Sequence, residues 1–145
     1  LGAVLADFMA GAVEYLTADN DPDHWDIIEG QGSLYHVSYS GVTLALIHGG
    51  QPDALVICHE PTRKHMRGLP HYTLPSLEQV RNMGLDLARV ANPKCQVVGY
   101  AINTAALGED EAGQYLADLE SRLGLPATDP YRYGAGKLAD ALDAV

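Results

Sequence analysis

The chain has 145 residues, of which 47% are hydrophobic and 19% charged, and its formal net charge is −10. This length and composition are typical of one globular domain and exclude extended disorder. The negative charge argues against a nucleic-acid or anionic-membrane partner. No apolar run reaches the roughly 18 residues of a membrane span, and residues 1–16 are not expected to be a signal peptide, because they lack a basic start and carry Asp7 and Glu14.

Hydrophobic residues at steps of three and four predict an amphipathic helix over residues 1–16, which the turn-forming residues 17–23 end. Residues 25–29 predict a short strand. Residues 40–48 predict a buried helix that stops at Gly49 and Gly50. The continuous apolar run 54–59 predicts a strand covered on both faces.

In the second half, Ser76 and Gln79 form a capping box that predicts a helix running to about residue 90. A covered strand is expected over 96–102, and a helix over 109–123 that ends before Gly124. A short strand within 125–130 and a helix over 136–145 complete the chain.

Strands that alternate with helices predict an α/β fold, with a parallel sheet and flanking helices in one domain over residues 1–145. Ligands bind outside the carboxyl ends of such strands. Three predicted strands end in polar pairs, Glu29-Gly30, His59-Glu60 and Asn103-Thr104. We therefore expect these residues to share one rim of the sheet.

Glu29 ends its predicted strand, as the acid of a Walker B strand does. In such a strand the acid holds magnesium beside phosphates. Glu29 could equally cap the following loop. A nucleotide hydrolase also needs a glycine-rich loop with a lysine upstream, and residues 134–137 come too late and lack its spacing. Either the phosphate loop precedes Leu1 in a longer protein, or this rim serves another ligand.

His59 is a candidate general base, because it ends a strand and titrates near neutrality, although it could also just order its loop. His59, His65 and His71 are evenly spaced, but the prolines between them fix no metal geometry, so we predict no metal site. Cys58 is expected to be a buried structural thiol. With Cys95 it makes two unbridged cysteines, which favours a reducing cytoplasm.

Three other features have both a functional and a plain structural interpretation. Asn103-Thr104 could read a base or amide, or form a turn. The loop 129–134 could close a pocket or pack over the sheet. Arg63, Lys64 and Arg67 could receive an anion or form a solvated loop, and the helix start at Ser40-Gly41 could hold one with its amides.

Three stretches carry a resemblance to a known family: "ADFMAGAVEYL", "IIEGQGSLYHVSYSGVTLALIHGGQPDALVICHEPTR" and "GLPATDPYRYGAGKLADAL". Together they resemble the C-terminal domain of the bacterial D-glutamate N-acetyltransferase (DgcN-like) family, long known as a domain of unknown function. The similarity covers essentially residues 1–145.

The resemblance implies a P-loop NTPase-like fold of the dethiobiotin synthetase type, preceded in full-length members by a Rossmann-like domain and by the phosphate loop. Members acetylate D-glutamate from acetyl-CoA. Glu29 then matches the Walker B-like acid, with Gly30 and Gly32 in its glycine turn, and Asn103 matches the residue that reads adenine. The other matching residues belong to the strand-end motif, namely His59, Glu60 and Arg63.

Because these residues are expected at the rim of the sheet, we hypothesise direct acyl transfer. Glu29 or His59 would deprotonate the amine, and amides near residues 30–33 or at Ser40-Gly41 would stabilise the oxyanion. Arg63, Lys64 and Arg67 would suit coenzyme A phosphates or glutamate carboxylates. The alternatives are an ATP- and Mg²⁺-dependent kinase or ligase, or a non-catalytic nucleotide-binding domain. Because sheet strands would be missing from this fragment, we also expect it to form a homo-oligomer.

Overall fold

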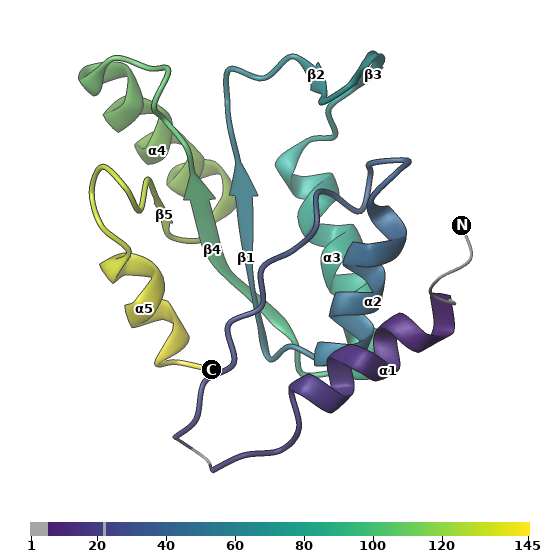
Figure 1. Cartoon of the computed structure of the whole chain (residues 1–145). Helices are drawn as coiled ribbons and strands as arrows, with labels where there is room; N and C mark the ends of the chain where they lie inside the picture. The colour runs from purple at the N-terminus through teal and green to yellow at the C-terminus, as the bar shows by residue number, and fades with distance from the viewer. Residues whose placement is uncertain (1–5, 22) are drawn as a thin grey trace. The chain divides into compact units, whose positions relative to one another are not determined.

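The computed structural model describes residues 6–21 and 23–145 (Figure 1). Within them the chain forms two compact units. The helical unit comprises the described residues up to Asp53 together with Met83–Cys95, and the sheet unit comprises Ala54–Asn82 and Gln96–Val145. Helix α3 (Leu77–Ala91) contributes residues to both units.

The helical unit is built around α1 (Ala6–Leu16) and α2 (Ser40–Gly50), which pack against each other. A Cβ on Gly49 would clash with the Ala10 carbonyl and the Val13 side chain, so this glycine permits the close approach. The helix was expected to stop at Gly49 and Gly50, but it includes both glycines. It ends at Gly50, and Gln51 caps it with a left-handed φ of 45° and an N–H that donates to the carbonyl of Ile47. Residues 1–5 of the predicted first helix lie outside the described residues.

The predicted strand 25–29 is absent, because residues 24–31 have an irregular conformation with no strand pairing in the described chain. Ile27 is 95% exposed. A strand requires hydrogen bonds to a neighbour, and its sequence pattern alone cannot supply that neighbour. Glu29 therefore does not end a strand of the sheet.

The sheet unit contains the parallel sheet predicted from the sequence, with strands in the order β1 (Ala54–His59), β4 (Gln96–Ile102) and β5 (Ala127–Thr128). The central strand β4 is the most deeply buried, and Tyr100 and Ile102 have no exposed surface. The expectation that β1 is covered on both faces is only partly right, because Val56 and Cys58 are exposed. With β1 at the edge of the sheet, one side of it lacks a neighbouring strand.

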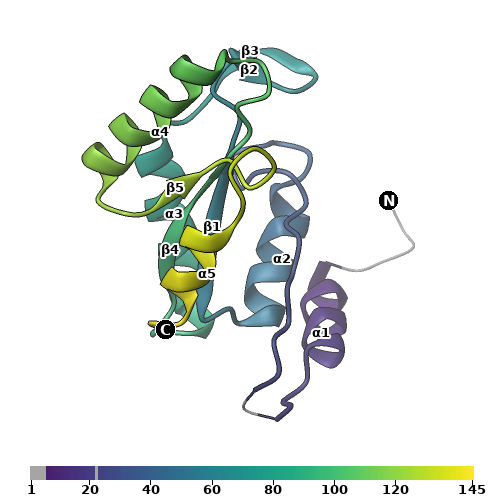
Figure 2. The ribbon, with the colours of Figure 1, turned by 90° about the vertical axis from the view of Figure 1, so that its left-hand side faces the viewer.

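Helices α4 (Glu109–Leu123) and α5 (Gly136–Leu142) belong to the sheet unit (Figure 2). The buried face of α4 consists of Ala112, Leu116, Leu119 and Leu123, as the helical periodicity predicted. Gly124 follows with a φ of 70°, and its N–H donates to the carbonyl of Glu120, as a helix-ending glycine does. Gly99 of β4 leaves room for Leu138 of α5, which lies 2.5 Å from an added Cβ.

The segment after β1 is not the simple basic loop of the sequence interpretation. It contains the antiparallel hairpin of β2 (His65–Met66) and β3 (Leu69–Thr73). Gly68 has a φ of 74°, which suits the two-residue turn between the strands. Met66 is buried and anchors the hairpin. The capping box then starts α3, since Ser76 Oγ accepts the Gln79 N–H at 3.2 Å and Gln79 Oε1 accepts the Ser76 N–H at 2.8 Å.

Candidate functional site

The carboxyl ends of β1 and β4 lie side by side, as the parallel topology predicts. The register pairs His59 with Ile102, and the Asn103 N–H donates to the carbonyl oxygen of His59 at 2.8 Å. This hydrogen bond continues the ladder one residue beyond the strands. It brings the polar residues that follow both strands to one edge of the sheet.

His59 is partly buried at this edge. Burial lowers the pKa of its imidazole, since a low-polarity environment disfavours the charged form. The negative charge of Glu60 acts in the opposite direction, and the positive charge of Arg63 lowers the pKa further. The net shift is downward, so His59 is neutral at neutral pH and can accept a proton.

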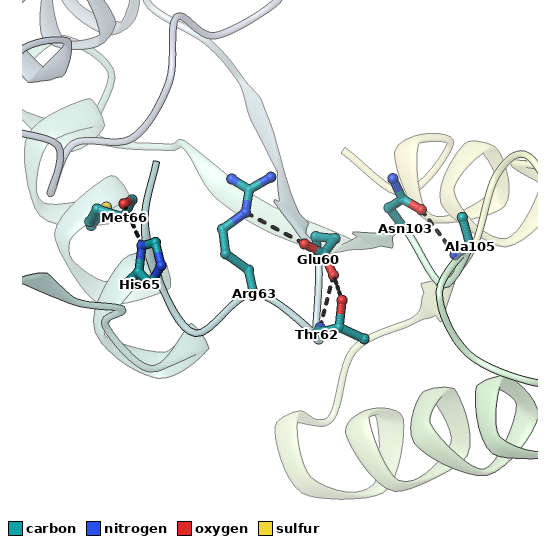
Figure 3. A network of polar contacts seen from close by, with 7 residues as sticks. All are labelled: Glu60, Thr62, Arg63, His65, Met66, Asn103 and Ala105. Atoms are coloured by element: carbon teal, nitrogen blue, oxygen red, sulfur yellow. Dashed lines mark hydrogen bonds and ion pairs between the residues drawn. The ribbon is translucent and has the colours of Figure 1, made fainter. Parts of the chain in front are cut away.

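Glu60 is occupied by contacts within its own loop (Figure 3). Its Oε1 accepts the Thr62 N–H at 2.9 Å and also the Thr62 hydroxyl, and its Oε2 lies 3.5 Å from Arg63 Nε. The hydroxyl of Thr62 is the main cause of the lowered pKa of Glu60, and it outweighs the raising effect of desolvation. Glu60 therefore stays ionised. Its contacts indicate that it orders the loop and holds Arg63, and that it does not act as a proton-transfer group.

Asn103 forms the turn that the sequence allowed, without losing its capacity to bind a ligand. Its Oδ1 accepts the Ala105 N–H at 3.0 Å. Figure 3 shows that this contact turns the amide nitrogen away from Ala105. The two N–H donors of that nitrogen can therefore serve a ligand that carries hydrogen-bond acceptors.

A buried carboxylate joins the loop after β5 to the loop after β4. Asp129 is 4% exposed, and its Oδ2 accepts both the N–H (2.8 Å) and the hydroxyl (2.6 Å) of the fully buried Thr104. Its Oδ1 accepts the N–H groups of Tyr131 at 3.0 Å and Arg132 at 3.1 Å. Arg132 Nη2 returns to the carbonyl oxygens of Thr104 (3.2 Å) and Leu107 (3.1 Å). We call Asp129, Thr104 and Arg132 the rim clasp.

The strand ends and the loop after β5 enclose an open pocket of about 910 Å³, which is within the size range of small-molecule sites. Its polar lining combines a base, an amide, two cations and two carboxylates. The residues with these groups are His59, Asn103, Arg63, Arg132, Glu60 and Asp129. All lining residues belong to the sheet unit.

The structure thus brings together four residues of the predicted site, His59, Glu60, Arg63 and Asn103. The basic side chains of Lys64 and Arg67 lie on the exposed segment and hairpin after β1 and do not line this pocket. The remaining predicted site residues, Glu29, Gly30, Gly32, Ser40 and Gly41, belong to the helical unit.

In the helical unit the glycine turn has a structural cause of its own. Gly32 has a φ of 73°, and an added Cβ would lie 3.0 Å from the Cβ of Tyr39. At the start of α2, the Ser40 N–H already donates to the His36 carbonyl at 2.9 Å. The Ser40 amide is therefore engaged within the turn that it was expected to offer to an anion.

The sequence interpretation missed Cys58 and Arg132 as lining residues and Asp129 as the residue that holds the rim. Cys58 was expected to be buried, but it is exposed and lines the pocket. Adjacent strand residues point to opposite faces, yet a pocket that wraps around a strand end can contact both. The signal for Asp129 was present in the loop 129–134, which does line the pocket, although no periodicity predicts its partner Thr104.

The histidines are dispersed. His65 Nδ1 lies 2.9 Å from the carbonyl oxygen of its neighbour Met66, and His71 is exposed on β3. Throughout residues 6–21 and 23–145, no three His, Cys, Asp or Glu side chains are grouped as metal ligands. In the same part of the chain, every helix is too short or too polar to cross a bilayer.

A parallel sheet with flanking helices and a polar pocket outside its strand ends defines the α/β class, whose members bind ligands at that position. The family model described as "Domain of unknown function (DUF1611_C) P-loop domain" matches residues 1–139. The chain belongs to this family, as its resemblance predicted.

Known relatives agree with this assignment. Over 145 residues the chain is 68% identical to a D-glutamate N-acetyltransferase of Tritonibacter scottomollicae. The aligned region covers 100% of this chain and 44% of that protein. Over 138 residues it is 45% identical to a D-glutamate N-acetyltransferase of Pseudoalteromonas sp, covering 95% of this chain and 42% of that protein.

A crystal structure of a DUF1611 family protein from Anabaena variabilis matches the fold with a TM-score of 0.87 at 39% identity. The match covers 99% of this chain and 42% of that chain. The chain thus spans less than half the length of these relatives.

Proposed function

We propose that this chain forms the C-terminal part of a D-glutamate N-acetyltransferase that takes its acyl group from acetyl-CoA. The observation that carries the proposal is the pocket at the strand ends, where a neutral histidine, an amide and two arginines face one space. Relatives named for this activity, at 68% and 45% identity, supply the reaction class. The rest of the protein, including a Rossmann-like N-terminal domain, completes the active site.

The chemistry requires a base, because the ammonium group of an amino acid has no lone pair until it loses a proton. His59 accepts that proton on its ring nitrogen. The amine nitrogen then forms a bond to the thioester carbonyl carbon, and the carbon–sulfur bond breaks. As the amide forms, its nitrogen gives up a second proton, which the leaving thiolate takes up, and His59 releases the first proton to solvent, so the products are the N-acetylated amino acid, the free thiol and one proton, with His59 again neutral.

The pocket residues fit the two substrates chemically. Guanidinium groups bind carboxylates and phosphates in a two-pronged geometry, and both substrates are anionic. The amide nitrogen of Asn103 offers donors to a purine ring or a pantetheine carbonyl. Lys64 and Arg67 add positive charge on the segment after β1, where the phosphates of the donor would extend. We prefer His59 over Glu29 as the base, because His59 ends β1 and lines this pocket, whereas Glu29 ends no strand in the described chain.

The P-loop description of the family favours one competing function, an ATP- and Mg²⁺-dependent kinase or ligase. The two functions differ in their requirement for ATP. A kinase or ligase would consume ATP and would use the carboxyl groups of the amino acid, whereas acyl transfer from a thioester needs no ATP and modifies the amine.

The test uses the full-length protein with D-glutamate or L-glutamate, each supplied with acetyl-CoA, ATP and Mg²⁺, or both. Products are identified by mass spectrometry. We expect N-acetylglutamate from the D-enantiomer with acetyl-CoA alone, and an equal yield when ATP is added. ADP or AMP formation without an acetylated product would transfer the assignment to the kinase or ligase.

A further inference from the structure

Arg132 and Arg63, the two cations of the pocket, differ in the groups that their guanidinium nitrogens contact. Arg63 lies 3.5 Å from the carboxylate of Glu60. Arg132 Nη2 instead donates to two backbone carbonyls, those of Thr104 and Leu107, which carry no net charge. Within residues 6–21 and 23–145, no carboxylate lies within ion-pair distance of the Arg132 guanidinium.

The carboxylate in the same loop does not neutralise Arg132. Asp129 accepts a hydrogen bond from the backbone N–H of Arg132 and not from its guanidinium. Both carboxylate oxygens are already engaged, since Oδ2 accepts the N–H and hydroxyl of Thr104 and Oδ1 accepts the N–H groups of Tyr131 and Arg132. The guanidinium is thus fixed at one nitrogen, and Arg132 lines the pocket. An arginine that is already restrained loses little side-chain entropy when it binds an anion.

We infer that Arg132 is a specificity-determining residue that binds an anionic oxygen group of the ligand, and that Asp129 is the positioning residue that holds it there. The group is a carboxylate of the amino acid or a phosphate of the acyl donor, both of which match the two-pronged guanidinium. The inference rests on the proposed function for the identity of these two ligands. It goes beyond that function because it assigns the binding of the ligand's anionic group to the loop after β5.

The experiment measures steady-state kinetics of the full-length protein with R132M and R132K. Loss of a charge-assisted, two-pronged contact corresponds to roughly a tenfold or greater loss of binding. We expect R132M to raise the KM of one substrate about tenfold or more, with kcat within about threefold of wild type. R132K should recover part of the loss, and D129N should raise the same KM. If the KM for D-glutamate rises, Arg132 binds a carboxylate of the amino acid. If the KM for acetyl-CoA rises, Arg132 binds a phosphate of the acyl donor.

Arg122 provides the matched control, because it lies on α4 and pairs with the exposed Glu78 at 3.4 Å. R122M removes the same charge and is expected to leave both KM values unchanged. The inference is overturned if R132M leaves both KM values unchanged. It is also overturned if R132M raises both KM values equally and lowers the unfolding temperature, since that pattern belongs to a purely structural residue.

A binding measurement separates this inference from the proposed function. Coenzyme A and D-glutamate are each tested for their effect on the thermal unfolding of wild type and R132M, which requires no turnover. If wild type binds either probe but makes no N-acetylglutamate, the proposed function fails, and loss of that stabilisation in R132M supports the inference. If neither probe stabilises wild type, or if R132M retains the full effect, the inference fails.

Discussion

Replacing His59 with asparagine in the full-length protein is expected to lower kcat for acetylation by about 10²- to 10⁴-fold, the range for loss of a general base. Asparagine keeps the approximate size of the side chain but cannot accept the proton. KM is expected to change much less, because the reaction needs His59 for proton transfer. The measurement is the rate of free thiol release from acetyl-CoA in the presence of D-glutamate.

The pH dependence gives a second view of the same residue. A base works in its neutral form, so activity is lost as pH falls through its pKa. Because burial lowers the pKa of His59, we expect the acid limb of kcat/KM to lie below the ordinary histidine value of about 6.5. That limb should disappear in the residual activity of H59N.

Two further variants make this prediction specific. His71 is an exposed histidine of the same unit that does not line the pocket, and H71N is expected to retain wild-type kcat. E29Q tests the other candidate base. Near-normal turnover by H59N would contradict the account, and combined with a large loss in E29Q it would assign proton transfer to Glu29.

Replacing Asp129 with alanine is expected to destabilise the protein by about 3 kcal/mol, one of the largest effects available on the surface of this pocket. The carboxylate is 4% exposed and satisfies donors of Thr104, Tyr131 and Arg132. Its removal leaves the N–H and hydroxyl of Thr104 buried without a partner. Thermal unfolding should shift downward by several degrees, and amide exchange should increase in residues 104–107 and 127–134.

The pH dependence of this stabilisation follows from the direction of the pKa shift. Burial alone would raise the pKa of Asp129, but the hydrogen bonds from Thr104, Arg132 and Tyr131 outweigh burial and lower it. The ionised form is therefore the one that the fold favours. Its stabilisation is complete above the unfolded pKa of about 3.9 and is lost as pH falls through the lower folded pKa. The difference in stability between wild type and D129N should shrink over that acidic range.

Asp118 is the control for this substitution, because it is an exposed aspartate on α4 that accepts a hydrogen bond from the Gln114 side chain, one turn away. D118A is expected to change the free energy of unfolding by no more than about 0.5 kcal/mol. Equal effects of D129A and D118A would show that the rim clasp does not stabilise the fold.

Local patterns predicted much of the sheet unit. The bounds of β1, β4 and α4 agree with the predicted ranges, because each has a continuous apolar run or a 3.6-residue period with a recognisable end. The capping box at Ser76 formed as predicted. The alternation of strands and helices predicted the parallel sheet, although it did not predict the strand order β1-β4-β5.

The failures concern partners that are distant in sequence. Residues 25–29 have a strand-like pattern, but the described chain gives them no neighbouring strand. Asp129 and Thr104 are 25 residues apart, and no spacing rule connects a loop aspartate to a buried hydroxyl at that distance. Cys58 is exposed because β1 lies at the edge of the sheet, which its apolar sequence does not reveal. The homo-oligomer and the N-terminal Rossmann-like domain stay predictions.

The central claim is that the pocket at the ends of β1 and β4 is where acyl transfer occurs. A crystal structure of the full-length protein with coenzyme A and N-acetyl-D-glutamate tests it most directly. The account predicts that the amide nitrogen of the product lies within about 3.2 Å of a ring nitrogen of His59, directly or through one water molecule. It also predicts that an anionic group of one ligand contacts Arg132. Ligands bound elsewhere, with no atom in contact with His59, Asn103 or Arg132, would contradict the account.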